Sequence, residues 1–148
     1  MSAVSFFVPG IPIAQGSKRH VGRGIMVESS KHLKPWRLDV TALAREAHTG
    51  PPLEDATVGL IFVFPRPKAH YRTGRNAHLL RPQAPERPIV KPDLDKLCRS
   101  VLDSLTAAQA IRDDSTVTGL TARKRYGDMP GVHVHIATRR LLARQDAA

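Results

Sequence analysis

The side chains best suited to chemistry are aspartates that lie on either side of one predicted helix. Asp93 and Asp95 lie where the chain enters this helix, and the pair Asp113 and Asp114 follows it. If Asp93 is still extended, its alternation with Asp95 can direct both carboxylates into one pocket. Carboxylate oxygens are ligands that Mg²⁺ prefers, and water and a substrate phosphate complete its octahedron. Such an ion can activate a water molecule for attack on a phosphodiester. A carboxylate from the turn after the helix can be a third ligand only if the fold brings that turn back to the start of the helix.

Each of these carboxylates also has an ordinary structural explanation. Asp93 is a standard helix N-cap, and the helix dipole favours an acid such as Asp95 in the first turn. Two adjacent aspartates after a helix are typical of a turn. Asp103 lies four residues after Arg99 on the same helix and can form an ion pair with it. An Asp-x-Asp pattern alone is therefore weak, and the rest of the chain has to decide between the two interpretations.

The composition indicates a polyanionic partner. The 148 residues include 23 Lys plus Arg against 13 Asp plus Glu, which gives a net charge of +10. Hydrophobic residues make up 41% of the chain, enough for a single core. Aromatic residues make up only 5%, too few for a binding mode that stacks unpaired bases on rows of rings. Phosphate contacts are therefore the expected source of affinity.

The single cysteine and the N-terminus bear on the compartment. Cys98 has no partner for an internal disulfide, and one thiolate cannot build a zinc site of several thiolates. It lies on an apolar helical stripe, so we expect a core thiol. The N-terminus lacks the basic start and long apolar stretch of a signal peptide, and no window approaches the length of a membrane span. We therefore expect a cytoplasmic protein.

The hydrophobic pattern predicts one α/β (α+β) domain over residues 1–148. We expect strands over residues 4–8, 57–64, 116–126 and 132–138, a two-stranded ribbon around residues 21–27, and helices over residues 35–50 and 94–108. The basic tail from Arg139 is expected to be a short or frayed helix. This order of elements favours a mixed β-sheet, with parallel and antiparallel pairs, packed against two main helices.

A basic, proline-rich loop over residues 65–91 interrupts this pattern. It holds Arg66, Lys68, Arg72 and Arg75 among other cations, against the single acid Glu86. A segment of this length without a pattern is uncommon inside a compact domain unless it is functional or disordered. It is either a solvated, mobile loop or a loop that contacts phosphates.

Four short segments resemble the RusA family of endodeoxyribonucleases in order and spacing. They are Lys91-Pro-Asp-Leu-Asp-Lys-Leu97, Val101-Leu-Asp-Ser-Leu105, Ile111-Arg-Asp-Asp-Ser115 and Arg123-Lys-Arg-Tyr126. The opening Gly10-Ile-Pro-Ile-Ala-Gln-Gly-Ser-Lys-Arg19 is also similar to the N-terminal segment of that family. The similarity covers most of the chain, and the stretch from Lys91 to Tyr126 is its specific part.

This resemblance implies a homodimeric, Mg²⁺-dependent nuclease that places paired nicks symmetrically across a Holliday junction in DNA recombination and repair. Mn²⁺ is an alternative ion. Family members are often encoded by phages or prophages, which implies a bacterial host cell. On matching positions, Asp93, Asp95 and Asp114 take the places of the catalytic, metal-binding aspartates. The neighbouring Asp113 is the alternative to Asp114, because adjacent residues in a turn can point either way.

One position departs from the family pattern, which often has a lysine four residues after the second aspartate. This chain has Arg99 there. Arginine keeps the positive charge but does not readily give up a proton, so Arg99 can stabilise a phosphate or orient Asp95 but is a poor general acid or base. Lys96 is the nearest lysine.

Other basic residues are candidates for phosphate contacts, with a solvated basic surface as the alternative. They are Lys18, Arg19, Lys96, Arg123 and Arg125. His133 and His135 point to the same face of a predicted strand. They are not expected to bind a metal, because no third ligand has a recognisable spacing.

Two rival functions stay open from the sequence. One is a non-catalytic, basic nucleic-acid-binding protein, and the other is a nuclease for other branched DNA, such as flaps or forks. Removing Mg²⁺ separates the first from a junction nuclease. Without Mg²⁺ a nuclease binds the junction but does not cleave it, whereas a pure binding protein does not cleave with any metal.

Overall fold

The hydrophobic core of the molecule lies against one face of a four-stranded sheet. The computed structural model describes residues 3–16, 18–20, 26–28 and 31–138. The strands β1 (Ala3–Pro9), β4 (Ala56–Phe64), β5 (Val117–Tyr126) and β6 (Gly131–Thr138) form the sheet in the order β1-β6-β4-β5. β4 and β5 are parallel, whereas β6 pairs antiparallel with both β1 and β4. The predicted mixed sheet is thus confirmed.

Alternation along β6 shows which face of the sheet is buried. Val132, Val134 and Ile136 are fully buried, whereas His133 and His135 between them are exposed. Period-two burial of this kind is what a sheet with one covered face requires. The register places Phe62 of β4 beside Val132, on the covered face.

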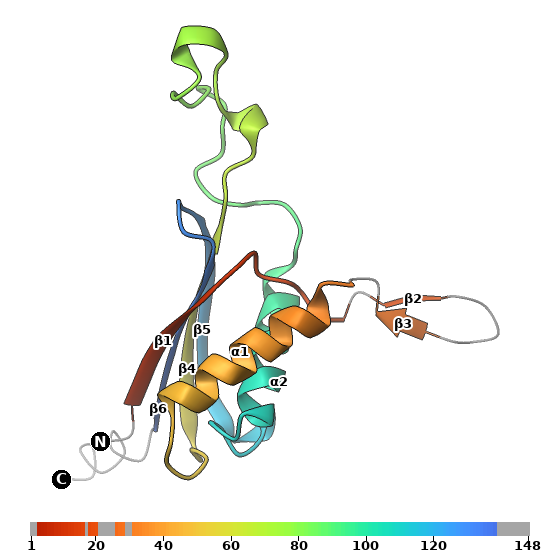
Figure 1. Ribbon diagram of the computed structural model, residues 1–148, viewed down its shortest axis with the longest axis vertical. Coiled ribbons are helices and arrows are strands. Elements are labelled where there is room, and N and C mark those ends of the chain that lie inside the picture. The colour runs from red at the N-terminus through yellow and green to blue at the C-terminus, as the bar shows by residue number, and fades with distance from the viewer. Residues whose placement is uncertain (1–2, 17, 21–25, 29–30, 139–148) are drawn as a thin grey trace.

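Two helices cover that face (Figure 1). α1 (Leu33–Ala47) buries Trp36, Val40 and Ala44, and α2 (Leu94–Ala107) buries residues that include Leu97, Val101 and Leu105. The helices contact each other, as Thr41 of α1 donates a hydrogen bond to the carbonyl of Ser104 at 3.4 Å. The predicted combination of a mixed sheet with two main helices, an α+β fold, is confirmed.

Two predicted elements differ from the structure at their edges. α1 spans Leu33–Ala47, where we expected residues 35–50, and Pro35 lies in its first turn. The ribbon consists of β2 (Lys18–His20) and β3 (Met26–Glu28). We expected its first strand at Val21, whereas β2 ends one residue earlier. The turn of the ribbon and the predicted tail helix from Arg139 lie outside the described residues.

The basic loop leaves the end of β4 and projects beyond the sheet as an arm, defined here as residues 65–91 (Figure 1). It contains two short 3₁₀ turns, η1 (Lys68–His70) and η2 (Gly74–Asn76), and a bridge between Tyr71 and Leu80. At its base, the Arg66 guanidinium lies 4.4 Å from the centre of the Tyr126 ring and donates a hydrogen bond to the Pro85 carbonyl at 2.6 Å. Most of its side chains are exposed, so the arm contributes little to the core. Its conformation depends on its own hydrogen bonds and on the contacts of Arg66 at its base.

None of the helices in the described part of the chain combines the length and the apolar character that a membrane crossing needs.

Packing between α2 and the sheet should dominate the stability of the domain. Leu105 is fully buried, so Leu105→Ala leaves a cavity and should lower the free energy of unfolding by about 3 kcal/mol. Leu38 on α1 is 59% exposed, so Leu38→Ala should cost less than about 1 kcal/mol. Urea denaturation of both variants checks this, and equal losses would contradict the assignment of the core.

Candidate active site

The start of α2 presents two carboxylates to solvent. Asp93 is the N-cap residue with an extended backbone, φ −69° and ψ 138°, but its side chain makes no capping hydrogen bond. It is 53% exposed, and its nearest cation is the Lys96 ammonium at 3.5 Å. Asp95, in the first turn, is also exposed. Capping does not account for the Asp93 side chain, so both carboxylates are available to a cation.

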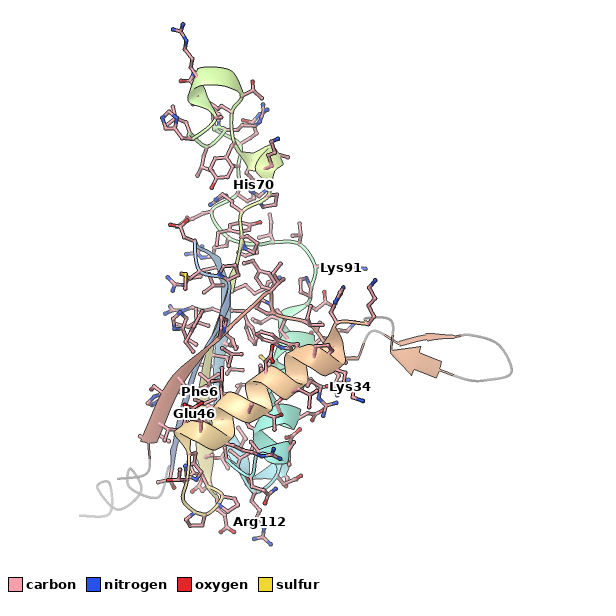
Figure 2. All side chains as sticks on the ribbon, viewed as in Figure 1. Phe6, Lys34, Glu46, His70, Lys91 and Arg112 are labelled. Carbon is pink, nitrogen blue, oxygen red and sulfur yellow. The ribbon has the colours of Figure 1, made fainter. Side chains whose placement is uncertain are left out.

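A lysine on β5 holds the turn that leads to Asp93. The Lys124 ammonium donates hydrogen bonds to the carbonyls of Val90 and Pro92, at 2.8 and 2.9 Å. Lys91, Pro92, Asp93 and Lys96 line a shallow hollow beside this turn. Figure 2 shows Lys91 on the loop that leads into α2, at the end of the helical layer from which the arm projects.

Asp114 lies near the other end of α2. Its carboxylate accepts a hydrogen bond from Thr106 at 2.8 Å, in the last turn of the helix. At 1.5 Å per residue, Thr106 is about 16 Å along the axis from Asp95. No three His, Cys, Asp or Glu side chains within the described ranges are close enough together to hold a metal ion. A single chain therefore does not gather the three predicted ligands, and their binding of one ion stays a prediction.

Asp114 is paired instead with Asp103, for which an ion pair with Arg99 was one interpretation of the sequence. Burial is the largest effect on Asp114 and raises the pKa of its carboxyl. The Thr106 hydrogen bond opposes this shift, and the hydrogen bond and charge of Asp103 add to it. Asp103 also accepts a hydrogen bond from the Gln15 amide. Asp103 and Asp114 thus form a second acidic pair, away from Asp93 and Asp95.

The adjacent Asp113 has a local structural role. Its carboxylate accepts hydrogen bonds from the backbone and hydroxyl of Ser115, at 3.1 and 2.5 Å, and caps the 3₁₀ turn η3 (Asp114–Thr116). These bonds lower the pKa of Asp113. Of the two neighbours, Asp114 is therefore the one that faces α2.

The N-terminal segment lies along α2 between the two acidic pairs. Gln15 donates its backbone N–H to the Lys96 carbonyl at 3.0 Å, and Ser100 donates to the Ile13 carbonyl at 2.8 Å. Gly16 has a φ of +107°, and a Cβ there would lie 2.8 Å from the Arg99 guanidinium. Arg99 forms no ion pair with the described residues, so none of their carboxylates neutralises its charge.

The predicted DNA contacts fall into separate regions. Arg123 pairs in register with Ile61 and lies on the open face of the sheet, where it lines a hollow with His133 and His135. Arg125 lines a second hollow with Arg66 at the base of the arm. Lys68, Arg72 and Arg75 belong to the arm, which Figure 2 marks at His70. Lys18 and Arg19 are in β2, and their side chains lie outside the described part of the structure.

The remaining candidates have structural partners. Cys98 is buried, and burial is the main cause that raises the pKa of its thiol to about 11, with the Asp95 charge adding to it. It is a core thiol, as predicted. His135 is 2.7 Å from the Ser5 hydroxyl, and the His133 ring lies 4.6 Å from the ring of Phe7.

Sequence reasoning missed three residues of this region: Gln15, Asp103 as a partner of Asp114, and Lys124. Gln15 lies in the N-terminal segment that carries part of the family resemblance. Lys124 lies between the two arginines that we chose, and strand alternation places it on the opposite face, beside the buried Phe62. Period-two alternation was the signal that could have found it.

The acidic pair near the end of α2 should respond to loss of one member. In Asp103→Asn, the pKa of Asp114 should fall towards its ordinary value, because a like charge is removed and the new amide can donate a hydrogen bond to ionised Asp114. Carboxyl ¹³C NMR titration measures this. Asp113→Asn is the control and should shift the pKa of Asp114 less, because the charge of Asp113 has a smaller effect on Asp114 than that of Asp103. An unchanged pKa in Asp103→Asn would contradict the pairing.

Comparison of the chain with known proteins identifies its family. The family model described as "Endodeoxyribonuclease RusA" matches residues 9–137. The "Uncharacterized protein YqaN" of Bacillus subtilis (strain 168) is 31% identical over 147 residues, which cover 92% of this chain and 96% of that protein. The matched region runs from the end of β1 to β6 and includes both acidic pairs, the arm and Lys124. The chain belongs to the RusA family of endodeoxyribonucleases.

Proposed function

We propose that the protein is a Mg²⁺-dependent endonuclease that resolves Holliday junctions by paired symmetric nicks. The observation that carries this proposal is the exposed Asp93–Asp95 pair at the start of α2, whose first carboxylate makes no capping bond. In a chain with a net charge of +10, an exposed carboxylate pair beside a basic arm suits a metal-assisted reaction on a polyanion.

The residues at the start of α2 fit Mg²⁺. This ion is usually held by carboxylates, with water and substrate phosphate completing the octahedron, so Asp93 and Asp95 can supply two of its protein ligands. Oxygen ligands also suit Mn²⁺, which is the alternative ion. When bound there, the ion would supply an activated water and would neutralise charge on the phosphodiester.

The cations around this pair have roles that follow from their chemistry. Arg99 is always protonated, so in this proposal it stabilises phosphate charge and does not move a proton. Lys96, 3.5 Å from Asp93, adds a second positive charge near the scissile phosphate. The arm, with Arg66, Lys68, Arg72 and Arg75, would contact the DNA backbone further from the cleaved bond, which makes affinity dependent on salt.

Replacing one carboxylate should separate binding from cleavage. Asp95→Asn removes a charge but keeps the size of the side chain. It should lower the cleavage rate of a synthetic four-way junction by on the order of a hundredfold or more. Junction affinity should hold or rise, because a negative charge near the phosphates is lost.

The measurement is single-turnover cleavage alongside gel-shift binding. Glu46→Gln is the matched control, because this exposed acid on α1 is distant from Lys91 in Figure 2 and should leave both quantities unchanged. If Asp95→Asn cleaves like the wild type, the proposed site is wrong. If the wild type binds junctions but never cleaves them, the non-catalytic binder is favoured.

We also propose that the protein acts as a homodimer whose subunits complete each other's site. Two-fold symmetry suits paired nicks, because a four-way junction presents strands related by a similar axis. Asp95 and Asp114 lie at opposite ends of α2 in one chain. Asp114 of the partner subunit could therefore complete the set begun by Asp93 and Asp95, as the family ligand set requires.

A mixture of two inactive variants tests this shared site. In a heterodimer of Asp95→Asn with Asp114→Asn, a shared arrangement leaves one site with both aspartates and one with neither. Co-expressed subunits should then nick one strand of a junction, although each variant alone is inactive. Asp93→Asn mixed with Asp95→Asn is the control, because every site then lacks one carboxylate of the first pair. Sites built within one chain would leave both mixtures inactive.

A further inference from the structure

Lys124 is a charged side chain that the proposed chemistry does not yet use. It lies in β5 with Phe62 as its register partner, on the face of the sheet that the helices cover. Its ammonium donates to the carbonyls of Val90 and Pro92 at 2.8 and 2.9 Å. It has no carboxylate within 4 Å in the described part of the chain, so its charge is directed to these two peptide groups.

The two carbonyls flank Lys91 and lie directly before Asp93. An ammonium has three donors in fixed relative directions, so two bonds to one segment restrain the path of its backbone. The bond to Pro92 is the closer of the two to Asp93 in sequence, and Asp93 keeps its extended N-cap conformation without a side-chain bond of its own. The direction of the Asp93 carboxylate therefore depends on the backbone that Lys124 holds.

The end of β5 also fixes the other end of the arm. Tyr126, two residues after Lys124, contacts the Arg66 guanidinium at 4.4 Å and the His70 ring at 5.5 Å. Lys124 and Tyr126 are on the same face of β5, so one strand end holds the arm where it leaves β4 and where it returns to α2. The arm and the carboxylate turn thus share one rigid support.

We propose that Lys124 is a positioning residue for the cleavage reaction, which fixes Asp93 by holding the carbonyls of Val90 and Pro92. This rests on the proposed function. A misplacement of about 1 Å in a catalytic group can cost roughly a hundredfold in rate, so a restraint of this kind acts on turnover more than on affinity.

Lys124→Met tests the proposal, because it keeps most of the stem and removes the donors. Its single-turnover cleavage rate should fall by about tenfold to a hundredfold, while junction affinity changes by less than about threefold. Hydrogen exchange should become faster over residues 88–97 and stay unchanged over β6. Arg112→Met is the control for lost charge in the exchange experiment. Arg112 pairs with Glu54 at 2.7 Å and lies far from Lys91 in Figure 2, so this variant should keep the wild-type exchange over residues 88–97.

Two conservative variants extend the test. Lys124→Gln keeps one donor and should fall between wild type and Lys124→Met in rate, and it replaces the methionine variant if that one does not fold. Lys124→Arg keeps the charge and the donors and should recover more of the rate than Lys124→Gln.

Several results would overturn the proposal. They are a wild-type rate in a folded Lys124→Met or Lys124→Gln, an unchanged exchange over residues 88–97, and equal losses of affinity and rate. If the wild type cleaves no junction with any metal, the proposed function fails, whereas the exchange experiment still decides whether Lys124 holds the turn before Asp93.

Discussion

The parallel pairing of β4 with β5 is the constraint on which the rest of the molecule depends. Two parallel neighbours need a crossover, and here α2 runs back along the sheet between them. The start of α2 therefore lies at the end of β4, and the end of α2 lies at the start of β5. This places Asp93 and Asp95 beside the base of the arm and Asp114 at the opposite end of the helix.

The same constraint explains why a basic, proline-rich segment lies next to acidic residues. The arm is the connection between β4 and α2, and it ends next to the exposed carboxylates at the start of α2. In the proposed function, positive charge on the arm attracts the DNA backbone, and the carboxylates at its base hold the metal ion. Tyr126 and Lys124, at the end of β5, fix the two ends of the arm.

The sequence predicted the elements well, because their signals are local. The apolar stripe through Leu97, Val101 and Leu105 determines α2, and alternation through Val132 to Ile136 determines β6. The relation between distant residues was less accessible. Capping of η3 by Asp113 leaves Asp114 facing α2. Asp103, for which an ion pair with Arg99 was one interpretation, accepts a hydrogen bond from the Gln15 amide. These depend on how the crossover and the N-terminal segment pack, which no short pattern encodes.

In the proposed function, the protein cleaves branched DNA with a metal ion held at the start of α2. Incubating the unaltered protein with a labelled four-way junction and with linear duplex, each with Mg²⁺ or EDTA, tests it most directly. We predict paired, symmetric nicks in the junction with Mg²⁺, and intact DNA in the other three reactions. Cleavage in EDTA, or equal cleavage of duplex and junction, would contradict the claim.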